Sequence, residues 1–161
     1  MLQQAAKATY EAHQNGLLSV IWMYPKGKAV PKKNQDNDIH LFAGGAGVAL
    51  ALDADFVKIK YPQDFKKKTL QDYKEVVTAS GRTGVICSGG AKRGTKQFLQ
   101  TLHDQINISG TRGNATARNI YQRKLDEAVR MANAISAISV FNYSVDDAYK
   151  IFKGELKLTK K

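Results

Sequence analysis

Apolar residues fall along this chain in short runs, separated by stretches in which they recur at helical spacing. Three short runs are rich in β-branched, aliphatic and aromatic residues and predict strands at residues 17–24, 55–61 and 85–88. Residues 114–117, between Gly113 and Arg118, are ambiguous by propensity and are a candidate fourth strand. Helical spacing predicts five helices, over residues 2–15, 38–52, 70–80, 92–106 and 124–140. Ser144 and Asp147 are spaced as in a capping box, which predicts a last helix. Because strand and helix alternate, we expect an α/β fold with a parallel sheet and right-handed crossovers.

Two of these elements carry a sharper expectation. The strand at residues 17–24 is almost entirely apolar, so we expect it to be buried on both faces. The helix at residues 38–52 has a small-residue face formed by Gly44, Gly45 and Gly47. Such a face lets a helix pack closely on its neighbour, although three glycines weaken the helix itself.

The composition is that of one ordinary folded domain, with 161 residues of which 43% are hydrophobic and 24% charged. The 25 Lys and Arg residues outnumber the 14 Asp and Glu residues, so the formal net charge is +11. This charge favours anionic partners such as phosphorylated metabolites, nucleic acid or an acidic membrane surface. Basic residues are spread along the whole chain rather than gathered on one helix or interleaved with aromatic residues, so we expect no nucleic-acid binding. The short lysine runs are expected to be solvated loop or terminal charge: Lys32-Lys33, Lys66-Lys67-Lys68 and Lys160-Lys161.

Cysteine and histidine usage, together with the absence of a signal-peptide pattern, gives expectations about compartment, membrane and metal binding. Cys87 is the single cysteine, which excludes an intrachain disulfide and favours a reducing, cytoplasmic compartment. The sequence begins without the pattern of a signal peptide, and no apolar stretch approaches the roughly 20 residues that span a bilayer, so no membrane partner is expected. His13, His40 and His103 are scattered, and no spacing of ligand residues predicts a metal site. Strand alternation turns Cys87 away from Ser88, which predicts a packing role rather than a nucleophile.

Two lysines lie inside an apolar strand, where lysine is unusual. Alternation puts Lys58 and Lys60 on one face of that strand and Val57 and Ile59 on the other. If Val57 and Ile59 pack on helices, both lysines point inward. A buried lysine beside another cation is driven toward the neutral amine, a nucleophile that forms a Schiff base with a carbonyl substrate. The alternative is that the lysines pair with carboxylates or bind an anion.

Further candidate residues follow from strand ends. Trp22 and Tyr24 share one face of the preceding strand, so a phenol that can move a proton would lie near the lysines, although aromatic residues in strands are more often core. The segment Ser88-Gly89-Gly90 runs toward a helix expected to begin near residue 91, so its backbone N–H groups and the helix dipole would face an anion. Ala117-Arg118 adds a guanidinium at the end of the last strand. A lone Ser-Gly-Gly is usually only a turn, but on the last strands of a βα series it matches a phosphate site.

These residues together resemble a known enzyme family. The sequence reads VIWMYPKG at residues 20–27, ADFVKIKYP at 54–62, SGG at 88–90 and GNATARNIYQ at 113–122. Four motifs in this order and spacing, running over nearly the whole chain, resemble the archaeal-type class I fructose-bisphosphate aldolases, which also occur in bacteria.

The resemblance implies an activity and a role for each site residue. It implies that Lys58 forms a Schiff base with dihydroxyacetone phosphate, that Tyr24 is the general acid/base and that Trp22 lies beside it. It implies cleavage of fructose 1,6-bisphosphate into two triose phosphates, without a metal or other cofactor. The substrate phosphate would be held by the backbone of the loop and by a Gly-Arg pair that reads Ala-Arg here: Ser88, Gly89, Gly90, Ala117 and Arg118. The alanine methyl group is expected to crowd the phosphate or to exclude a positive φ.

The family fold is a whole (β/α)₈ barrel, and the motifs match its second half, strands five to eight with the helix before them. Residues 1–161 are therefore expected to form a partial barrel of about four βα units with a basic tail at residues 155–161. Four parallel strands cannot close, so two edges and one apolar face stay exposed, and at most weak activity is expected from this half alone. Two alternatives remain open: a related lyase or transferase acting on another phosphorylated keto compound, and a non-catalytic half-barrel that pairs with itself or with an N-terminal half.

Overall fold

The computed structural model describes residues 1–31, 38–62 and 67–159, so Lys32, Lys33, Lys66, Lys160 and Lys161 of the expected charge runs lie outside the described residues. The chain divides into two compact units. The first comprises Met1–Ser88 with Ser109–Thr111, and the second comprises Gly89–Ile108 with Arg112–Lys161. Each unit is described by itself.

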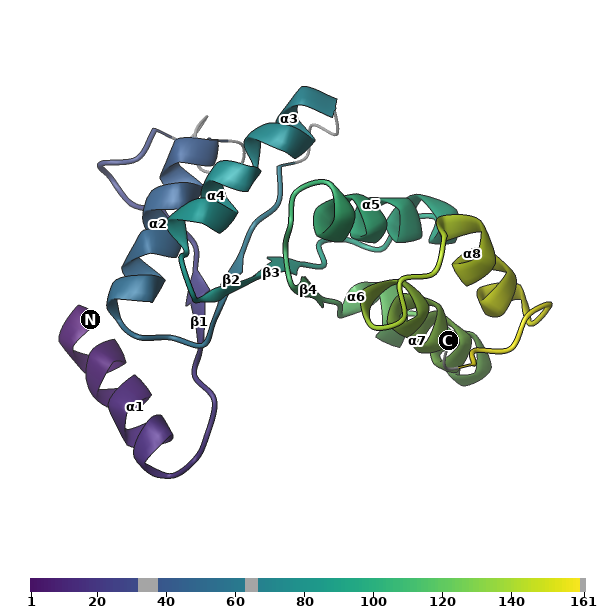
Figure 1. Ribbon diagram of the computed structural model, residues 1–161, viewed down its shortest axis with the longest axis horizontal. Coiled ribbons are helices and arrows are strands. Elements are labelled where there is room, and N and C mark those ends of the chain that lie inside the picture. Colours follow the sequence, from purple (N-terminus) through teal and green to yellow (C-terminus); the bar gives the residue numbers. More distant parts are fainter. Residues whose placement is uncertain (32–37, 63–66, 160–161) are drawn as a thin grey trace. The chain divides into compact units, whose positions relative to one another are not determined.

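The first unit alternates helices and strands as expected (Figure 1). Its helices are α1 Leu2–Gln14, α2 Ile39–Ala51, α3 Lys67–Asp72 and α4 Lys74–Ala79. Its strands are β1 Val20–Met23, β2 Phe56–Ile59 and β3 Gly84–Ser88. The prediction of a single helix over residues 70–80 is wrong in two respects. The helical segment begins at Lys67, inside an expected loop, and it is interrupted at Tyr73, which separates α3 from α4.

The three strands of this unit pair in parallel and in register. Trp22 is level with Lys58 on β1 and β2, and Lys58 is level with Ile86 on β3. Parallel strands need crossover connections, and α2 supplies the one between β1 and β2. Within this unit the strand order is β1-β2-β3, which is the order of the chain.

Helices α2 and α4 lie side by side and cover one face of these strands (Figure 1). Val57 and Ile59 are fully buried on that face, as the alternation predicted. The small-residue face of α2 is confirmed at Gly45, where an added Cβ would lie 2.8 Å from Met23 Cγ and 3.3 Å from Pro25 Cγ. Gly44, by contrast, has nothing within 4 Å of such an atom. Close approach of the helix to the strands therefore depends on Gly45.

The opposite face of the strands is not buried, so the prediction that the first strand is covered on both faces is wrong. Val20 is 45% exposed and Trp22 is 67% exposed. Leu17 and Leu18, predicted to belong to the strand, precede it and are exposed as well. The physical reason is that α2 covers one face only, and the uncovered face is the exposed apolar face expected of strands that do not close into a barrel.

The second unit is mainly helical. It contains α5 Thr95–Asn107, β4 Gly113–Ala115, α6 Arg118–Tyr121, α7 Leu125–Ser139 and α8 Val145–Lys153. Helices α5, α7 and α8 enclose a core that includes Leu99, Leu102 and Met131. The capping box at the start of α8 is confirmed, because Asp147 N–H donates to Ser144 Oγ over 3.1 Å.

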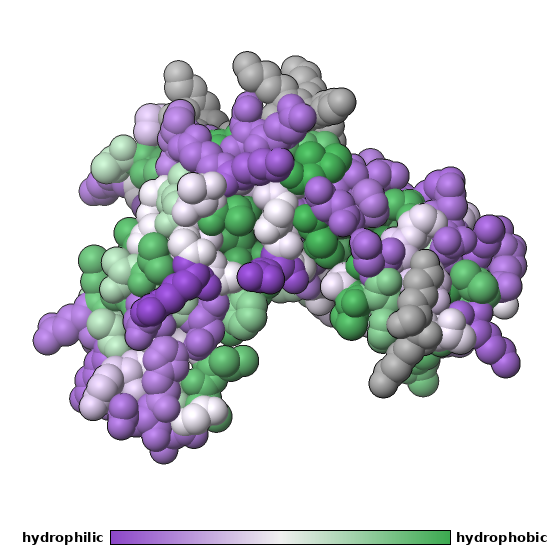
Figure 2. Space-filling view, in the orientation of Figure 1, coloured by the Kyte–Doolittle hydropathy of each residue, from purple (hydrophilic) through white to green (hydrophobic). Residues whose placement is uncertain are grey.

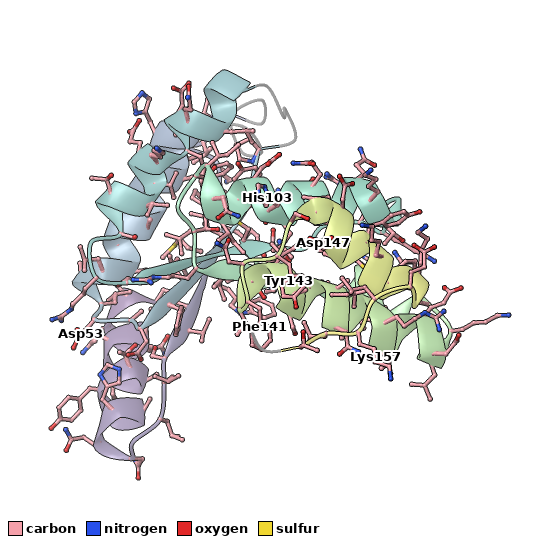
Figure 3. All side chains as sticks on the ribbon, turned by 45° about the vertical axis from the view of Figure 1, so that its right-hand side comes forward. Asp53, His103, Phe141, Tyr143, Asp147 and Lys157 are labelled. Carbon is pink, nitrogen blue, oxygen red and sulfur yellow. The ribbon has the colours of Figure 1, made fainter. Side chains whose placement is uncertain are left out.

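The segment after α8 returns to this core. Tyr143, on the connection between α7 and α8 (Figure 3), donates its hydroxyl hydrogen to Thr159 O over 3.0 Å. Leu158 packs against the same cluster of buried side chains. The described part of the basic tail is thus in contact with its unit through residue 159.

Apolar side chains also reach the surface of the molecule. Figure 2 shows green, apolar patches among the purple, hydrophilic side chains. The large apolar side chains that stay exposed in the second unit include Tyr121, Leu125 and Val129, which recur every four residues along α6 and α7. None of the helices within the described residues has the length and apolar content that crossing a lipid bilayer demands.

Candidate active site

The first unit brings the strand lysine together with the tryptophan of the neighbouring strand. Lys58 is held in the middle of β2 because its neighbours Val57 and Ile59 are anchored in the core. Register then sets Trp22 beside it on the same face, and Lys58 Nζ lies 3.6 Å from the centroid of the Trp22 ring. An ammonium group above an indole face is a favourable cation–π geometry. The contact fixes the amine at a defined place on the sheet.

The two strand lysines are less buried than the sequence pattern implied. Lys58 and Lys60 are both half-buried, and they share the face on which Trp22 is exposed. Within the described residues of this unit, helices α2 and α4 cover the opposite face, so the two lysines are less buried than inward-pointing side chains would be. The register itself is as predicted, with both lysines opposite the buried residues Val57 and Ile59.

Tyr24 directly follows β1 and is half-buried. No hydrogen bond or ring contact joins it to Lys58, although both residues belong to the described part of the chain. The first unit therefore assembles Lys58 with Trp22, and Tyr24 stands one strand position beyond Met23.

A buried polar cluster supports the segment that follows Lys58. Tyr73 donates its hydroxyl hydrogen to Lys60 O over 2.8 Å, and its ring lies 4.5 Å from that of Tyr61, centroid to centroid. Tyr61 OH is 2.7 Å from Ser109 Oγ, which in turn donates to Leu70 O over 2.7 Å. Composition and periodicity do not reveal this cluster, because Ser109 joins it from 48 residues further along the chain.

Cys87 belongs to the same buried region and is fully inaccessible, so its predicted packing role is confirmed. Burial raises the pKa of its thiol to about 12. Burial also raises the pKa of Tyr73 well above its ordinary value. Both groups are held in their neutral forms, and neither is suited to act as a nucleophile or base.

A glycine-rich loop lies at the start of the second unit. Gly89 N–H donates to Ala115 O over 3.2 Å, and a Cβ at Gly89 would lie 3.0 Å from both Ala115 O and Thr116 Cα. Gly90 has a φ of +66°, in the left-handed region that favours glycine. Glycine is thus required at Gly89 by space and at Gly90 by backbone conformation.

Two consecutive residues of α6 hold this loop. Arg118 Nε donates to Gly90 O over 3.0 Å while the side chain stays exposed. Asn119 is fully buried, donates from Nδ2 to Gly89 O and Ala91 O, and accepts from Arg93 N–H. Sequence reasoning selected Arg118 for its charge and missed Asn119. The sequence signal that could have identified Asn119 is its place beside Arg118, directly after the last predicted strand.

One detail of the phosphate-site expectation, the start of the following helix, is wrong. Helix α5 begins at Thr95 rather than near residue 91, because Arg93 N–H is taken by Asn119 Oδ1 and the intervening loop includes Gly94. Residues 91–94 therefore separate the Ser88-Gly89-Gly90 segment from the first residue of α5, so the segment does not lead straight into the helix N-terminus. The Gly89 N–H donates to Ala115 O. Ala117 has a φ of −135° and a ψ of −87°, so its backbone is not in the left-handed region, in keeping with the expectation that alanine excludes a positive φ.

The histidines pair with carboxylates instead of gathering around a common point. His13 Nε2 lies 2.9 Å from Asp55 Oδ2, which joins α1 to the start of β2. His40 Nδ1 lies 2.5 Å from Glu75 Oε1 across α2 and α4. Within residues 1–31, 38–62 and 67–159, no three His, Cys, Asp or Glu residues are grouped as metal ligands.

Comparison with known proteins assigns the family. The DeoC/LacD family aldolase model matches residues 1–123. This chain belongs to the DeoC/LacD aldolase family. The match covers both the strand that carries Lys58 and the loop that Arg118 and Asn119 hold.

Curated relatives of this aldolase-family chain are about twice its length. It is 48% identical over 157 residues to the fructose-bisphosphate aldolase/6-deoxy-5-ketofructose 1-phosphate synthase of Methanocaldococcus jannaschii, covering 98% of this chain and 49% of the relative. It is 31% identical over 148 residues to the fructose-bisphosphate aldolase class 1 of Halobacterium salinarum, covering 92% of this chain and 52% of the relative. The chain thus spans about half the length of the curated relatives it matches.

Solved structures give the same picture of this member of the aldolase family. The fructose-bisphosphate aldolase of Slackia heliotrinireducens superposes with a TM-score of 0.90 at 48% identity, over 99% of this chain and 50% of that one. An archaeal fructose-1,6-bisphosphate aldolase, with its catalytic Lys covalently bound to the carbinolamine intermediate of the substrate, superposes with a TM-score of 0.72 at 29% identity, over 86% of this chain and 51% of that one. The resemblance to class I aldolases and the α/β partial-barrel fold expected from the sequence are confirmed.

Proposed function

We propose that this chain carries the Schiff-base lysine and the phosphate-binding residues of a class I aldolase that cleaves fructose 1,6-bisphosphate, with Lys58 as the nucleophile. The observation that carries the proposal is the geometry of Lys58, a lysine in mid-strand whose amine lies 3.6 Å from the Trp22 ring centroid. Membership of the DeoC/LacD aldolase family and the covalently bound catalytic lysine of an archaeal relative support it.

The proposed chemistry begins when the neutral amine of Lys58 adds to the ketose carbonyl. The resulting carbinolamine loses water to give a protonated imine, which accepts the electron pair of the bond between its α carbon and its β carbon. That bond breaks as a base removes the proton of the hydroxyl group beyond it, so glyceraldehyde 3-phosphate leaves and an enamine remains. Protonation of the enamine carbon and hydrolysis of the imine release dihydroxyacetone phosphate and restore Lys58. We propose Tyr24 as the group that moves these protons and Trp22 as the support for the Lys58 side chain.

The phosphate-binding part of the proposal concerns the second unit. Gly90 is the exposed, left-handed residue of the loop, and Arg118 is bound to its carbonyl through Nε. Among the described residues this is the one hydrogen bond of the Arg118 side chain, so the two terminal nitrogens of its guanidinium can pair with a phosphate, an anion that arginine binds well. We therefore propose that Gly90 and Arg118 contact a substrate phosphate, that Gly89, whose N–H donates to Ala115 O, shapes the loop, and that Ser88 and Ala117 remain predicted members of the site.

Borohydride trapping tests the nucleophile directly. The chain is incubated with dihydroxyacetone phosphate, reduced with borohydride and mapped by peptide mass spectrometry. We expect an adduct on the peptide that contains Lys58. Lys58→Met should abolish the adduct, whereas the matched variant Lys60→Met, two positions away on the same face, should retain it. An adduct on Lys60, or equal labelling of both variants, contradicts the assignment.

A second substrate has a specific observation in its favour. The Methanocaldococcus jannaschii relative is also named a 6-deoxy-5-ketofructose 1-phosphate synthase. The same imine chemistry could therefore serve a transfer between phosphorylated keto compounds, as the sequence analysis left open. A panel of phosphorylated ketoses in the trapping assay distinguishes the two substrates by the concentration at which each half-saturates Lys58.

We also propose that the exposed face of β1 and β2 is covered by an N-terminal half-barrel. The chain spans about half the length of its relatives, and Val20 and Trp22 leave an apolar surface where a folded barrel has a packed interior. Mixing the chain with the unmatched half of the Slackia aldolase, followed by mass measurement in solution, should give a one-to-one complex. A stable homodimer that excludes the added half would favour self-association instead.

We further propose the cytoplasm as the compartment and a phosphorylated sugar, rather than nucleic acid, as the anionic partner. The one cysteine is a buried, free thiol, which suits a reducing compartment. Separating whole cells into cytoplasmic and membrane fractions tests the first point. Electrophoretic mobility shifts with RNA and DNA at low salt, where nonspecific binding is strongest, test the second.

A further inference from the structure

Asn119 is the most completely bonded side chain at the glycine-rich loop of the second unit. It is fully buried, and its amide nitrogen lies 3.2 Å from Gly89 O and 3.1 Å from Ala91 O. Its amide oxygen accepts from Arg93 N–H over 2.9 Å. A carboxamide has two N–H donors and one oxygen acceptor, and here every one of these three groups is used on the loop.

The hydrogen bonds of Asn119 restrict the backbone conformations of residues 89–94. Residues 89–94 include three glycines, which have the greatest backbone freedom of all residues and lose most entropy when they are fixed. Asn119 fixes three of the six residues from one point, because a side chain in a fully buried position has a single orientation. Without it, two carbonyl groups and one N–H group would lose their partners.

The same short helix links the loop to the arginine. Arg118 precedes Asn119 in α6 and donates to Gly90 O, the carbonyl between the two that Asn119 holds. The positions of the Gly90 backbone and of the Arg118 guanidinium therefore depend on one another through adjacent residues. A loop that shifts would move the N–H of Gly90 and the guanidinium together.

We infer that Asn119 is a positioning residue for phosphate: it holds the loop of residues 89–93 in the conformation that lets Gly90 and Arg118 bind the anion, without touching the anion itself. This inference rests on the proposed phosphate-binding role of the second unit. Asn119 contributes hydrogen bonds that the loop needs, and its effect on phosphate binding is separate from its effect on overall stability.

Inorganic phosphate is the probe, and the full chain is titrated while the amide resonances of Gly90 and Arg118 are followed by NMR. Asn119→Asp has nearly the same volume but replaces both N–H donors by an oxygen that repels the carbonyls of Gly89 and Ala91. We expect phosphate affinity to fall about tenfold or more. Tyr143→Phe is the matched control, because it removes the hydrogen bond to Thr159 O in the same unit without touching the loop. It should lower the melting temperature and leave phosphate affinity unchanged.

The outcomes distinguish failure of the proposed phosphate site from failure of the positioning role of Asn119. If the wild-type chain shows no phosphate-dependent shifts at Gly90 and Arg118, the proposed phosphate site itself is wrong. If the wild type binds and Asn119→Asp binds equally well, the site stands and the inference is overturned. Asn119→Ser, which keeps one donor, covers the case in which Asn119→Asp does not fold. It should bind phosphate with an affinity between those of wild type and a Gly90→Val, Arg118→Ala double variant, and wild-type affinity would overturn the inference.

Discussion

Lys58 Nζ lies 3.6 Å from the centroid of the Trp22 ring, a contact set by the parallel register of β1 and β2. The amine therefore does not depend on a flexible loop for its place. In the proposed reaction it has to meet a carbonyl carbon at a defined angle, and a side chain already held on one side has fewer conformations to lose.

The Trp22 contact gives a graded prediction. Trp22→Leu should slow borohydride-trappable adduct formation at Lys58 by about two- to fivefold, because without the ring the Lys58 side chain has about 0.5–1 kcal/mol more conformational entropy to lose before it meets the carbonyl. Trp22→Phe keeps a smaller aromatic face and should retain most of the rate. The measurement is adduct against time at fixed dihydroxyacetone phosphate. Equal rates in all three proteins would mean that the ring does not position the amine.

Helix α2 offers a matched pair of glycines for testing close packing. Gly45→Ala forces a methyl group against Met23 Cγ and Pro25 Cγ and should destabilise the chain by about 1–3 kcal/mol. Gly44→Ala, one residue earlier in the same helix and open on that side, should instead stabilise it by about 0.5–1 kcal/mol. Urea unfolding of both variants measures the difference. Changes of the same sign would show that helix propensity, and not space, dominates.

A second pair tests the loop of residues 89–94. Gly89→Ala brings Cβ to 3.0 Å from Ala115 O and Thr116 Cα, both backbone atoms that cannot rotate away. We expect a loss of about 1–3 kcal/mol of unfolding free energy, accompanied by changed amide shifts at Ala115 and Thr116. Gly94→Ala meets nothing within 4 Å and has a φ of −56°, so it should cost only the loss of glycine at the N-cap of α5, about 0.5–1 kcal/mol. A neutral Gly89→Ala would disprove the tight approach.

Asp55 should make the stability of the chain sensitive to acid. Donation from Ser19 N–H, and next the hydrogen bond with His13, lower the pKa of Asp55 below its ordinary value of 3.8. A lowered carboxyl pKa stabilises the folded state above the ordinary value, and the contribution is lost as pH falls through the lowered value. Asp55→Asn should therefore be less stable at neutral pH and show a flatter loss of stability below about pH 5. Urea unfolding across a pH series tests this, and parallel curves for the two proteins would refute it.

The Cys87 thiol should not react with thiol reagents in the folded chain. With a pKa of about 12 and no exposed surface, its thiol offers almost no thiolate to a reagent at about pH 8. A disulfide reagent should label it only after denaturant unfolds the protein. The rate of labelling then reports the opening of the first unit. Rapid labelling without denaturant would show that the region around Cys87 opens readily.

Local pattern predicted those features that depend on neighbours along the chain. Strand alternation placed Val57 and Ile59 on one face and Lys58 on the other, because a side-chain period of two is a property of any strand, and the structure buries the face with Val57 and Ile59. The capping box at Ser144 was readable for the same reason, since its partners are three residues apart. The family resemblance then supplied the parent fold, a (β/α)₈ barrel of which the motifs match half, and the expected roles of the site residues.

Features that depend on distant partners were missed. The exposure of Trp22 follows from what does or does not cover the sheet, and no run of residues encodes that locally. The start of α5 moved to Thr95 because Asn119, 26 residues further on, takes the N–H of Arg93. Ser109 joins Tyr61 and Leu70 for no reason visible in its own neighbourhood.

The return of Ser109–Thr111 to the first unit has a consequence for the synthesis of the chain. The first unit lacks Ser109, and hence the partner of the Tyr61 hydroxyl and of Leu70 O, until the ribosome has translated the whole of α5. Domains commonly fold as they emerge, N-terminal part first. That order cannot hold strictly here. The first unit is completed by Ser109–Thr111, which is synthesised after residues 89–108 of the second unit. A gene cut after Ser88 would accordingly encode not a smaller independent module but a first unit permanently missing one of its buried groups.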